Sequence, residues 1–293
     1  MTRRIRIVDV FTDKALAGNQ LAVVLDGKGL SNKDMQRIAR EMNFSETTFV
    51  FPPEKPEHAA RVRIFSPNAE MRFAGHPTIG TAWVLADEGL VDKEVREFTL
   101  EENVGPVPVR RDGPMFWPTN PPLSFGEVVP HAQVAAALGI DESDITGNVP
   151  AQVVTTGNPL LFVALRDVGA VDGATSDKER LEKLLRGGRA FGVYLFAPVG
   201  ENRLYSRMFS PDIPEDPASG SAGGPLGAFA VKYGLVARGP KVSLISEQGT
   251  KMGRPSILHI ELTYGESKDV PERSEVGGSV MPVLAGTLSD FEG

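Results

Sequence analysis

Two glycine-rich segments, each followed by an apolar helical pattern, are the first candidates for binding chemistry. Gly75-His76-Pro77 precedes one helix, and Gly220-Ser221-Ala222-Gly223-Gly224 precedes the other. Proline suits the first turn of a helix because its missing N–H has no intrahelical partner there. The exposed N–H groups of a helix N-terminus carry partial positive charge and bind carboxylates or phosphates. We therefore predict an anion site at the pair of turns, although either turn alone fits a plain strand-to-helix connection.

Three ionisable side chains close to these turns could move a proton. Glu46 precedes an apolar strand, His76 lies in the first turn, and Asp216 precedes the second turn. When the two halves of the chain are aligned, Asp216 has Met71 at its matching position and Glu46 has no acidic counterpart. This asymmetry favours one composite site with divided roles. Each residue also has a structural alternative: a solvated strand edge for Glu46, a satisfied histidine for His76 and a turn cap for Asp216.

The second turn adds the hydroxyl groups of Ser219 and Ser221. A serine hydrolase of the elbow type would read Gly-x-Ser-x-Gly, and this turn has Ser219 in place of the first glycine. A triad of Ser221, His76 and Asp216 nevertheless stays open as an alternative. The four histidines lack metal-ligand spacing, and neither G-x-G-x-x-G nor a Walker loop occurs.

Composition narrows the class of protein. The chain has 293 residues, 41% hydrophobic and 24% charged, as in an ordinary globular protein of about two domains. Its net charge of −7 and the lack of a basic run disfavour nucleic acid and anionic membranes as partners. The absence of cysteine excludes disulfides, thiolate metal sites and cysteine nucleophiles. With no apolar run near the roughly 18 residues of a membrane span and no secretory signal, we expect a soluble cytoplasmic protein.

An internal repeat organises the elements that must position these residues. Arg63-Ile64-Phe65-Ser66-Pro67 recurs as Arg207-Met208-Phe209-Ser210-Pro211, and Gly18-Asn19-Gln20-Leu21 recurs as Gly157-Asn158-Pro159-Leu160. The same order of elements follows in each half: apolar strand, serine-capped helix, strand, repeat strand, glycine-rich turn and helix. We therefore predict two homologous α+β halves that pack face to face.

The repeat predicts the bounds of these elements. The helices after the glycine-rich turns are expected at 78–88 and 223–233, and the serine-capped helices after Ser31 and Ser176. The boundary between the halves is expected in the proline-rich stretch 114–130, where no periodicity shows. Residues 276–283 read as one or two closing strands with a glycine bulge.

Four motifs together resemble one known family. They are GNQLAV at 18–23, NFSET at 43–47, FAGHPTIG at 73–80 and EDPASGSA at 215–222. These segments are similar to those of the PhzF phenazine-biosynthesis-like isomerases, and the likeness extends from about Arg6 to Leu288. Gln248-Gly249 and the segment 252–256 also resemble the family.

The resemblance implies an α+β fold like that of diaminopimelate epimerase, with two pseudo-symmetric domains, each a β-barrel around a central helix. The halves would be 1–122, joined by a C-terminal strand 275–290, and 123–274, with the active site in the cleft between them. The family also implies a homodimer and catalysis without metal or coenzyme. The epimerase uses two cysteines, which this chain lacks, so the resemblance points instead to the single catalytic glutamate of the PhzF members.

The motif positions carry the family's site residues onto this chain. Glu46, His76 and Asp216 would be catalytic, and Gly75, Ser219, Gly220 and Ser221 would bind substrate. The implied reaction moves a proton between carbons of a small carboxylic acid, similar to the isomerisation of trans-2,3-dihydro-3-hydroxyanthranilate. Glu46 would act first as base and then as acid, with a pKa raised by burial. A non-catalytic protein that binds small acids remains the other alternative.

Overall fold

The computed structural model describes residues 2–265 and 270–289, which divide into two compact units. Unit 1 is Met1–Thr119 with Gly277–Gly293, and unit 2 is Asn120–Val276. The sequence places these divisions at 122/123 and 274/275 instead. The division at 119/120 lies inside the predicted boundary stretch 114–130, which also holds strands β8 and β9. Short strands that contain or adjoin proline give little periodicity to read.

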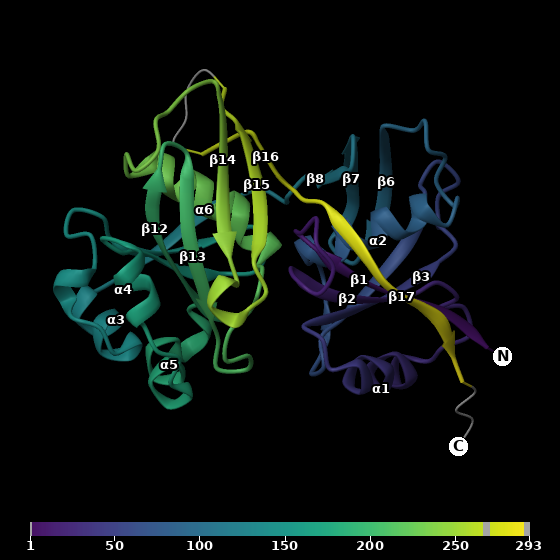
Figure 1. Ribbon diagram of the computed structural model, residues 1–293, viewed down its shortest axis with the longest axis horizontal. Helices are drawn as coiled ribbons and strands as arrows, with labels where there is room; N and C mark the ends of the chain where they lie inside the picture. Colours follow the sequence, from purple (N-terminus) through teal and green to yellow (C-terminus); the bar gives the residue numbers. More distant parts are fainter. Residues whose placement is uncertain (1, 266–269, 290–293) are drawn as a thin grey trace. The chain divides into compact units, whose positions relative to one another are not determined.

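Unit 1 is a curled sheet with one helix on each face (Figure 1). Its elements are β1 Arg3–Val10, β2 Asn19–Val24, α1 Asn32–Met42, β3 Glu46–Phe51, β4 Ala60–Phe65, β5 Glu70–Met71, α2 Gly75–Asp87, β6 Glu97–Glu102, β7 Gly105–Asp112, β8 Met115–Pro118 and β17 Val280–Leu288. The strand order is β17-β1-β2-β3-β4-β6-β7-β8, with β5 paired to β4.

Unit 2 has the same plan with more helices. Its elements are β9 Ser124–Val129, α3 His131–Leu138, β10 Ala151–Thr155, β11 Leu160–Ala164, α4 Val168–Gly173, α5 Lys178–Leu184, β12 Gly192–Gly200, β13 Arg203–Phe209, α6 Gly220–Lys232, β14 Lys241–Gln248, β15 Ser256–Thr263 and β16 Arg273–Gly277. Short 3₁₀ turns lie at Glu142–Asp144, Arg186–Gly188 and Thr250–Met252.

Apart from β5, the two sheets match strand for strand. Unit 2 has the order β9-β10-β11-β12-β13-β14-β15-β16, and the parallel pairs β11·β12 and β13·β14 match β2·β3 and β4·β6 of unit 1. The C-terminal strand β17 therefore takes in unit 1 the place that β9 takes in unit 2. It pairs antiparallel with β1 over Val280–Leu288. Residue 290 of the predicted strand 275–290 lies outside the described residues.

A central helix in each unit is buried on nearly every side. Eleven residues of α2 and eleven of α6 are buried, which explains why these helices lack a polar face in the sequence. Gly80 of α2 shows how closely the helix approaches its sheet, because a Cβ there would lie 2.5 Å from Leu21 Cδ2. Both helices begin three residues before the predicted starts, at Gly75 and Gly220.

Other helices cover the outer face of each sheet. In unit 1, α1 packs Met35, Ile38 and Ala39 against the sheet, and its predicted Ser31 cap is confirmed as a capping box with Asp34. In unit 2, α3, α4 and α5 share one core with the sheet. The cap of α5 is Asp177 and not the predicted Ser176, because aspartate accepts the N-terminal N–H bond equally well one residue later. Among the described residues, no helix has the length and apolar character required to cross a membrane.

Candidate active site

The Gly18-Asn19 turn places a polar side chain at the start of the unit 1 site. Gly18 has φ +67°, and a Cβ there would lie 2.3 Å from Val10 O, so only glycine fits without a shift of the backbone. The turn delivers Asn19, which is buried, as the first residue of β2. β2 runs parallel to β3, with Leu21 beside Glu46 in the register. The chain therefore brings Asn19 and Glu46 to the same end of the sheet.

Glu46 and His76 meet in unit 1. Glu46 is the first residue of β3 and His76 the second residue of α2, and His76 Nδ1 lies 3.4 Å from Glu46 Oε2. The His76 side chain is 4% exposed and the Glu46 side chain 14%. The structure thus brings together two of the three predicted catalytic residues, at the N-terminal end of the central helix.

Hydrogen bonds fix the His76 ring and its protonation. Nε2 lies 3.3 Å from Gln20 O, a backbone acceptor, so Nε2 carries the proton and Nδ1 presents a lone pair. Nδ1 lies 3.5 Å from Asn19 Nδ2, a donor. Burial lowers the pKa of His76 to about 3, against the smaller opposing effect of the Gln20 carbonyl. His76 is therefore neutral at pH 7, and its contact with Glu46 is not an ion pair. A neutral imidazole with a lone pair can accept a hydrogen bond from Glu46 whenever that carboxyl is protonated.

The start of α2 also offers backbone donors. Its N-cap is Ala74, whose methyl group cannot accept a hydrogen bond from the first turn. By helix geometry the N–H groups of Gly75 and His76 point out of the helix end, with the positive end of the dipole behind them. A substrate carboxylate or a developing enolate oxygen could bind there.

Unit 2 holds the remaining predicted residues at the start of α6. Ser219 is the N-cap, but its hydroxyl does not cap the helix; Ser219 Oγ donates to Asp216 Oδ2 over 2.5 Å. Ser219 and Gly220 are buried, whereas Asp216 and Ser221 are partly exposed. Ser221 O accepts a bond from Thr156 Oγ1 over 3.4 Å. The structure thus groups Asp216, Ser219, Gly220 and Ser221 around one helix N-terminus.

Two nearby glutamates have a structural role. Arg63 Nε and Nη2 bind Glu70 over 2.7 and 2.6 Å, and Arg207 Nε and Nη2 bind Glu215 over 2.9 and 2.8 Å. These repeat-equivalent pairs fasten the segment before each central helix to its sheet. Since a planar two-point pair fixes a carboxylate and engages both of its oxygens, these acids are poorly placed to carry a proton to a substrate. Asp216, the next residue, has no such counterpart in unit 1.

A family comparison agrees with the site motifs. The PhzC-PhzF family, described as phenazine biosynthesis-like protein, matches residues 8–286. The chain belongs to the PhzC-PhzF family. A relative from Mesorhizobium japonicum, named an uncharacterized isomerase, is 39% identical over 98% of this chain and 99% of its own. The trans-2,3-dihydro-3-hydroxyanthranilate isomerase of Pseudomonas aeruginosa is 36% identical over 86% of this chain and 88% of its own.

The solved structures confirm the fold predicted for a PhzC-PhzF member. One described as a predicted epimerase from Pseudomonas aeruginosa has a TM-score of 0.81 at 32% identity, and the match covers 99% of this chain and 100% of that one. The expected epimerase-like architecture of two pseudo-symmetric domains is therefore confirmed.

The contacts of His76 argue against a hydrolase triad in this PhzC-PhzF protein. A triad needs a basic imidazole with one nitrogen directed to the serine and the other to the acid. Here Nε2 faces Gln20 O, Nδ1 faces Asn19 and Glu46, and the lowered pKa makes the ring a weak base. Both ring nitrogens are therefore directed to residues of unit 1, and this arrangement disfavours His76 as the base of a serine triad.

Sequence reasoning missed several buried polar residues of the site. Asn19 contacts His76, Gln248 contacts the Asp216 segment, and Glu102 contacts the first turn of α2. Asn19 and Gln248 lay in motifs that resemble the family, yet neither had a chemical role in the prediction. Glu102 gave no signal, because a glutamate in the strand pattern FTLEE reads as solvent-exposed.

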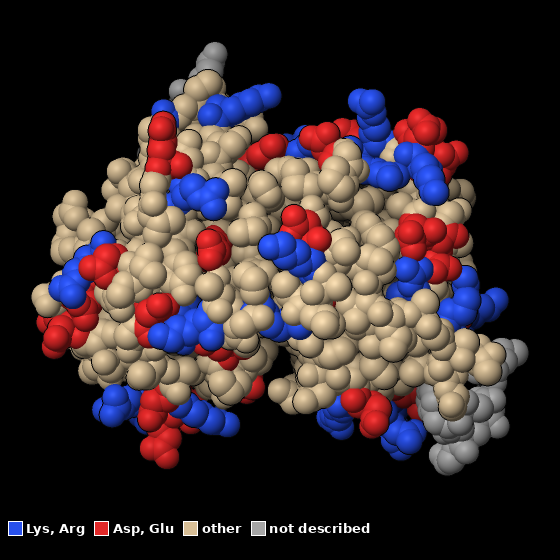
Figure 2. Space-filling view, viewed as in Figure 1, with Lys and Arg blue, Asp and Glu red and all other residues tan. Residues whose placement is uncertain are grey.

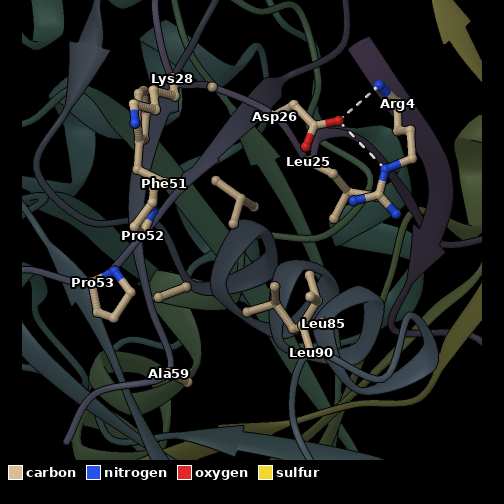
Figure 3. A pocket seen from close by; sticks show the side chains of 13 residues that line it. Arg4, Leu25, Asp26, Lys28, Phe51, Pro52, Pro53, Ala59, Leu85 and Leu90 are labelled. Atoms are coloured by element: carbon tan, nitrogen blue, oxygen red, sulfur yellow. Dashed lines mark hydrogen bonds and ion pairs between the residues drawn. The ribbon is translucent and has the colours of Figure 1, made fainter. Parts of the chain in front are cut away.

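A cavity of about 400 Å³ in unit 1 lies away from these residues (Figure 3). It is lined by Leu85 and Leu90, at and beyond the C-terminal end of α2, and by Phe51 and two prolines, with the Arg4–Asp26 ion pair at its edge. Ten residues of helix separate Gly75 from Leu85, roughly 15 Å at 1.5 Å per residue. The candidate site is therefore at the opposite end of the helix from this cavity.

The visible surface carries mixed charge (Figure 2). On that face Lys and Arg are interspersed with Asp and Glu on both units. Ion pairs such as Arg189–Glu127, at 2.7 Å, join opposite charges in the described part of the chain. Neighbouring opposite charges cancel at long range, so this face presents no extended field of one sign that would attract an anionic substrate.

Proposed function

We propose that this protein is a PhzF-type isomerase in which Glu46 moves a proton between carbons of a small carboxylic acid. The observation that carries the proposal is the Glu46–His76 contact at the N-terminal end of α2. A carboxyl group that is mostly shielded from water and lies beside a neutral imidazole can exist in both protonation states. That is the property required of one residue that takes a proton and then returns it.

The reaction balances without a further reagent. The Glu46 carboxylate removes a proton from one substrate carbon, and the electron pair of that C–H bond spreads into the adjoining conjugated system. The protonated Glu46 then donates to His76 Nδ1 while the intermediate is held. Return of the proton to a different carbon regenerates the carboxylate and completes an isomerisation.

The remaining residues bind and orient the substrate in this proposal. The N–H groups of Gly75 and His76, and those of Gly220 and Ser221, would hold the carboxylate and the developing negative charge. Asp216, fixed by Ser219, would accept a bond from an amino or hydroxyl group of the substrate. The homodimer and catalysis without coenzyme stay predictions from the resemblance.

Names of relatives supply the first compound to assay. Since the Pseudomonas aeruginosa relative is a trans-2,3-dihydro-3-hydroxyanthranilate isomerase, that compound should be offered first, followed by other small cyclic and amino acids. The assay is carbon-bound hydrogen exchange in deuterated water, followed by NMR. An isomerase incorporates deuterium at carbon as it turns over, whereas a protein that merely binds acids does not.

Glu46→Gln tests the central residue. Glutamine keeps the size of the side chain but cannot carry the proton, so turnover should fall by about 10²- to 10⁴-fold. Affinity measured by calorimetry should change little. Glu97→Gln, an exposed change at the start of β6, is the matched control and should keep full activity. Turnover by Glu46→Gln within a few-fold of wild type would refute the role of Glu46.

A further inference from the structure

Gln248 is held at the centre of a buried hydrogen-bond network beneath the Asp216–Ser221 segment. It ends β14 and is fully buried. Gln248 Nε2 donates to Asp216 O over 2.8 Å and to Ser219 Oγ over 3.1 Å. Its Oε1 accepts from Ser219 N–H over 3.1 Å and from Tyr194 OH over 2.9 Å. All four hydrogen-bonding positions of the carboxamide are therefore used.

The direction of these bonds specifies an amide. Gln248 donates to Ser219 Oγ, and Ser219 Oγ donates in turn to Asp216 Oδ2. A carboxylate at position 248 would face Asp216 O and Ser219 Oγ with no proton to donate, and its charge would lie close to the Asp216 carboxyl. The next residue, Gly249, adds a close backbone contact, because a Cβ there would lie 2.5 Å from Pro217 O. The end of β14 thus fixes both the side chain and the backbone of this segment.

The matching position of unit 1 is Glu102. In the parallel pairs, Arg61 lies beside Glu101 on β4·β6 and Tyr205 beside Glu247 on β13·β14. The next residue in each case, Glu102 or Gln248, ends the strand that follows the central helix. The repeat therefore places a buried side chain of the same shape under the start of each central helix.

Glu102 contacts the first turn of α2 in a way that suits its neutral form. It is 3% exposed, and its Oε1 lies 2.6 Å from Thr78 Oγ1. Thr78 Oγ1 also lies 2.8 Å from Ala74 O. One hydroxyl proton cannot satisfy two acceptors fully. If Glu102 carries a proton, it donates to Thr78 and Thr78 donates to Ala74 O, so both contacts are made.

We propose that the last residue of the strand after each central helix is a positioning residue of the active site. Gln248 holds the segment that carries Asp216 and Ser219, and Glu102 holds the turn that carries Gly75 and His76. The inference rests on the proposed function, since the positioned groups are those assigned to substrate. Neither residue touches the reacting atoms in this assignment.

Gln248→Glu is the decisive variant, and Gln152→Glu is its matched control. Gln152 is also buried in unit 2, donates to Gly126 O over 2.8 Å and accepts from Tyr233 OH over 2.5 Å. Both variants lose a buried amide, so both should lower the unfolding temperature. Only Gln248→Glu should speed hydrogen–deuterium exchange of the peptide 214–222, measured by mass spectrometry. It should also lower kcat/KM about 10- to 100-fold more than the control, the loss expected for two hydrogen bonds.

Three further variants keep the test decisive. Tyr194→Phe removes one bond to Gln248 and serves if Gln248→Glu does not fold. In unit 1, Glu102→Gln should retain about tenfold more kcat/KM than Glu102→Leu, because an amide can still donate to Thr78. Equal exchange of peptide 214–222 in the Gln248 and Gln152 variants would overturn the proposal, as would equal losses in the two Glu102 variants. Exchange needs no substrate, so it tests the positioning role even if wild type turns over none of the acids offered.

Discussion

Replacing Glu102 with glutamine should change how the stability of unit 1 depends on pH. Burial raises the pKa of Glu102 from about 4.5 to about 8, with the bond from Thr78 opposing the rise. In the unfolded chain the same carboxyl returns to its ordinary pKa. Between these two values the folded protein holds a proton that the unfolded chain has lost. Glutamine has a similar shape and never ionises, so Glu102→Gln removes the proton linkage and keeps the packing.

The sign and size follow from that difference in bound protons. Where the folded state binds one more proton, the free energy of unfolding falls as pH rises, by about 1.4 kcal/mol per pH unit. Below the unfolded pKa both states are protonated and wild type has no penalty. By pH 7 the penalty reaches about 3 kcal/mol, and it levels off near 5 kcal/mol above the folded pKa. As pH rises from 5 to 8, the free energy of unfolding of Glu102→Gln should therefore increase relative to that of wild type by these amounts.

Denaturant unfolding followed by tryptophan fluorescence is the assay. Trp83 on α2 and Trp117 on β8 are the two tryptophans of the chain, so the signal reports on unit 1. Glu101→Gln is the control, because hydrogen bonds from the Glu54 and Lys55 amides and from His58 outweigh desolvation and lower the pKa of Glu101. Its carboxylate stabilises the fold above its unfolded pKa, so the control difference has the opposite sign. If the free energies of unfolding of wild type and Glu102→Gln changed with pH in parallel, the assignment of Glu102 as a neutral, buried carboxyl would be refuted.

Three further changes test the packing around the site, each by denaturant unfolding. Gly80→Ala should cost about 1–3 kcal/mol, because the added Cβ meets Leu21 at 2.5 Å; no loss would mean that α2 can move away from its sheet. Arg207→Met should cost about 3–5 kcal/mol, since it leaves the partly buried Glu215 without its partner, and a neutral result would show that water reaches the carboxylate. Ser31→Ala should cost about 1 kcal/mol by removing the α1 cap, and Ser31→Asp should restore most of it; equal stability of the alanine and aspartate variants would contradict the cap.

The features that the sequence predicted are those set by local rules or by the repeat. The Ser31 cap, the two central helices and the strands after Gly18 and Gly157 follow from local residue preferences and apolar patterns. The repeat supplied the common plan, because one order of elements appears twice in one chain. The predicted starts of the central helices lie three residues C-terminal to the observed ones, because glycine and proline read as turn residues even where they form a first helical turn.

The polar side chains under the site could not be predicted, because their roles depend on contacts distant in sequence. Gln248 is 29 residues from Ser219, and Glu102 is 24 residues from Thr78. Nothing local distinguishes Glu102 from the neighbouring Glu101, although the two pKa values shift in opposite directions. Both side chains are buried. Successive strand residues point to opposite faces, so Glu101 meets two backbone amides and His58, whereas Glu102 meets Thr78, and a segment with two consecutive acids does not reveal that difference.

In unit 1 the C-terminal strand β17 takes the sheet position that β9 takes in unit 2, and this has a consequence for folding during synthesis on the ribosome. Unit 2 is one continuous segment, whereas unit 1 needs Gly277–Gly293 as well as its first 119 residues. The N-terminal part therefore emerges first but lacks its edge strand β17 until all of unit 2 has been synthesised. We expect unit 2 to finish folding earlier, against the usual N-to-C order. Until then the β1 edge stays open to pairing with another chain, so the nascent protein depends on β17 for protection against aggregation.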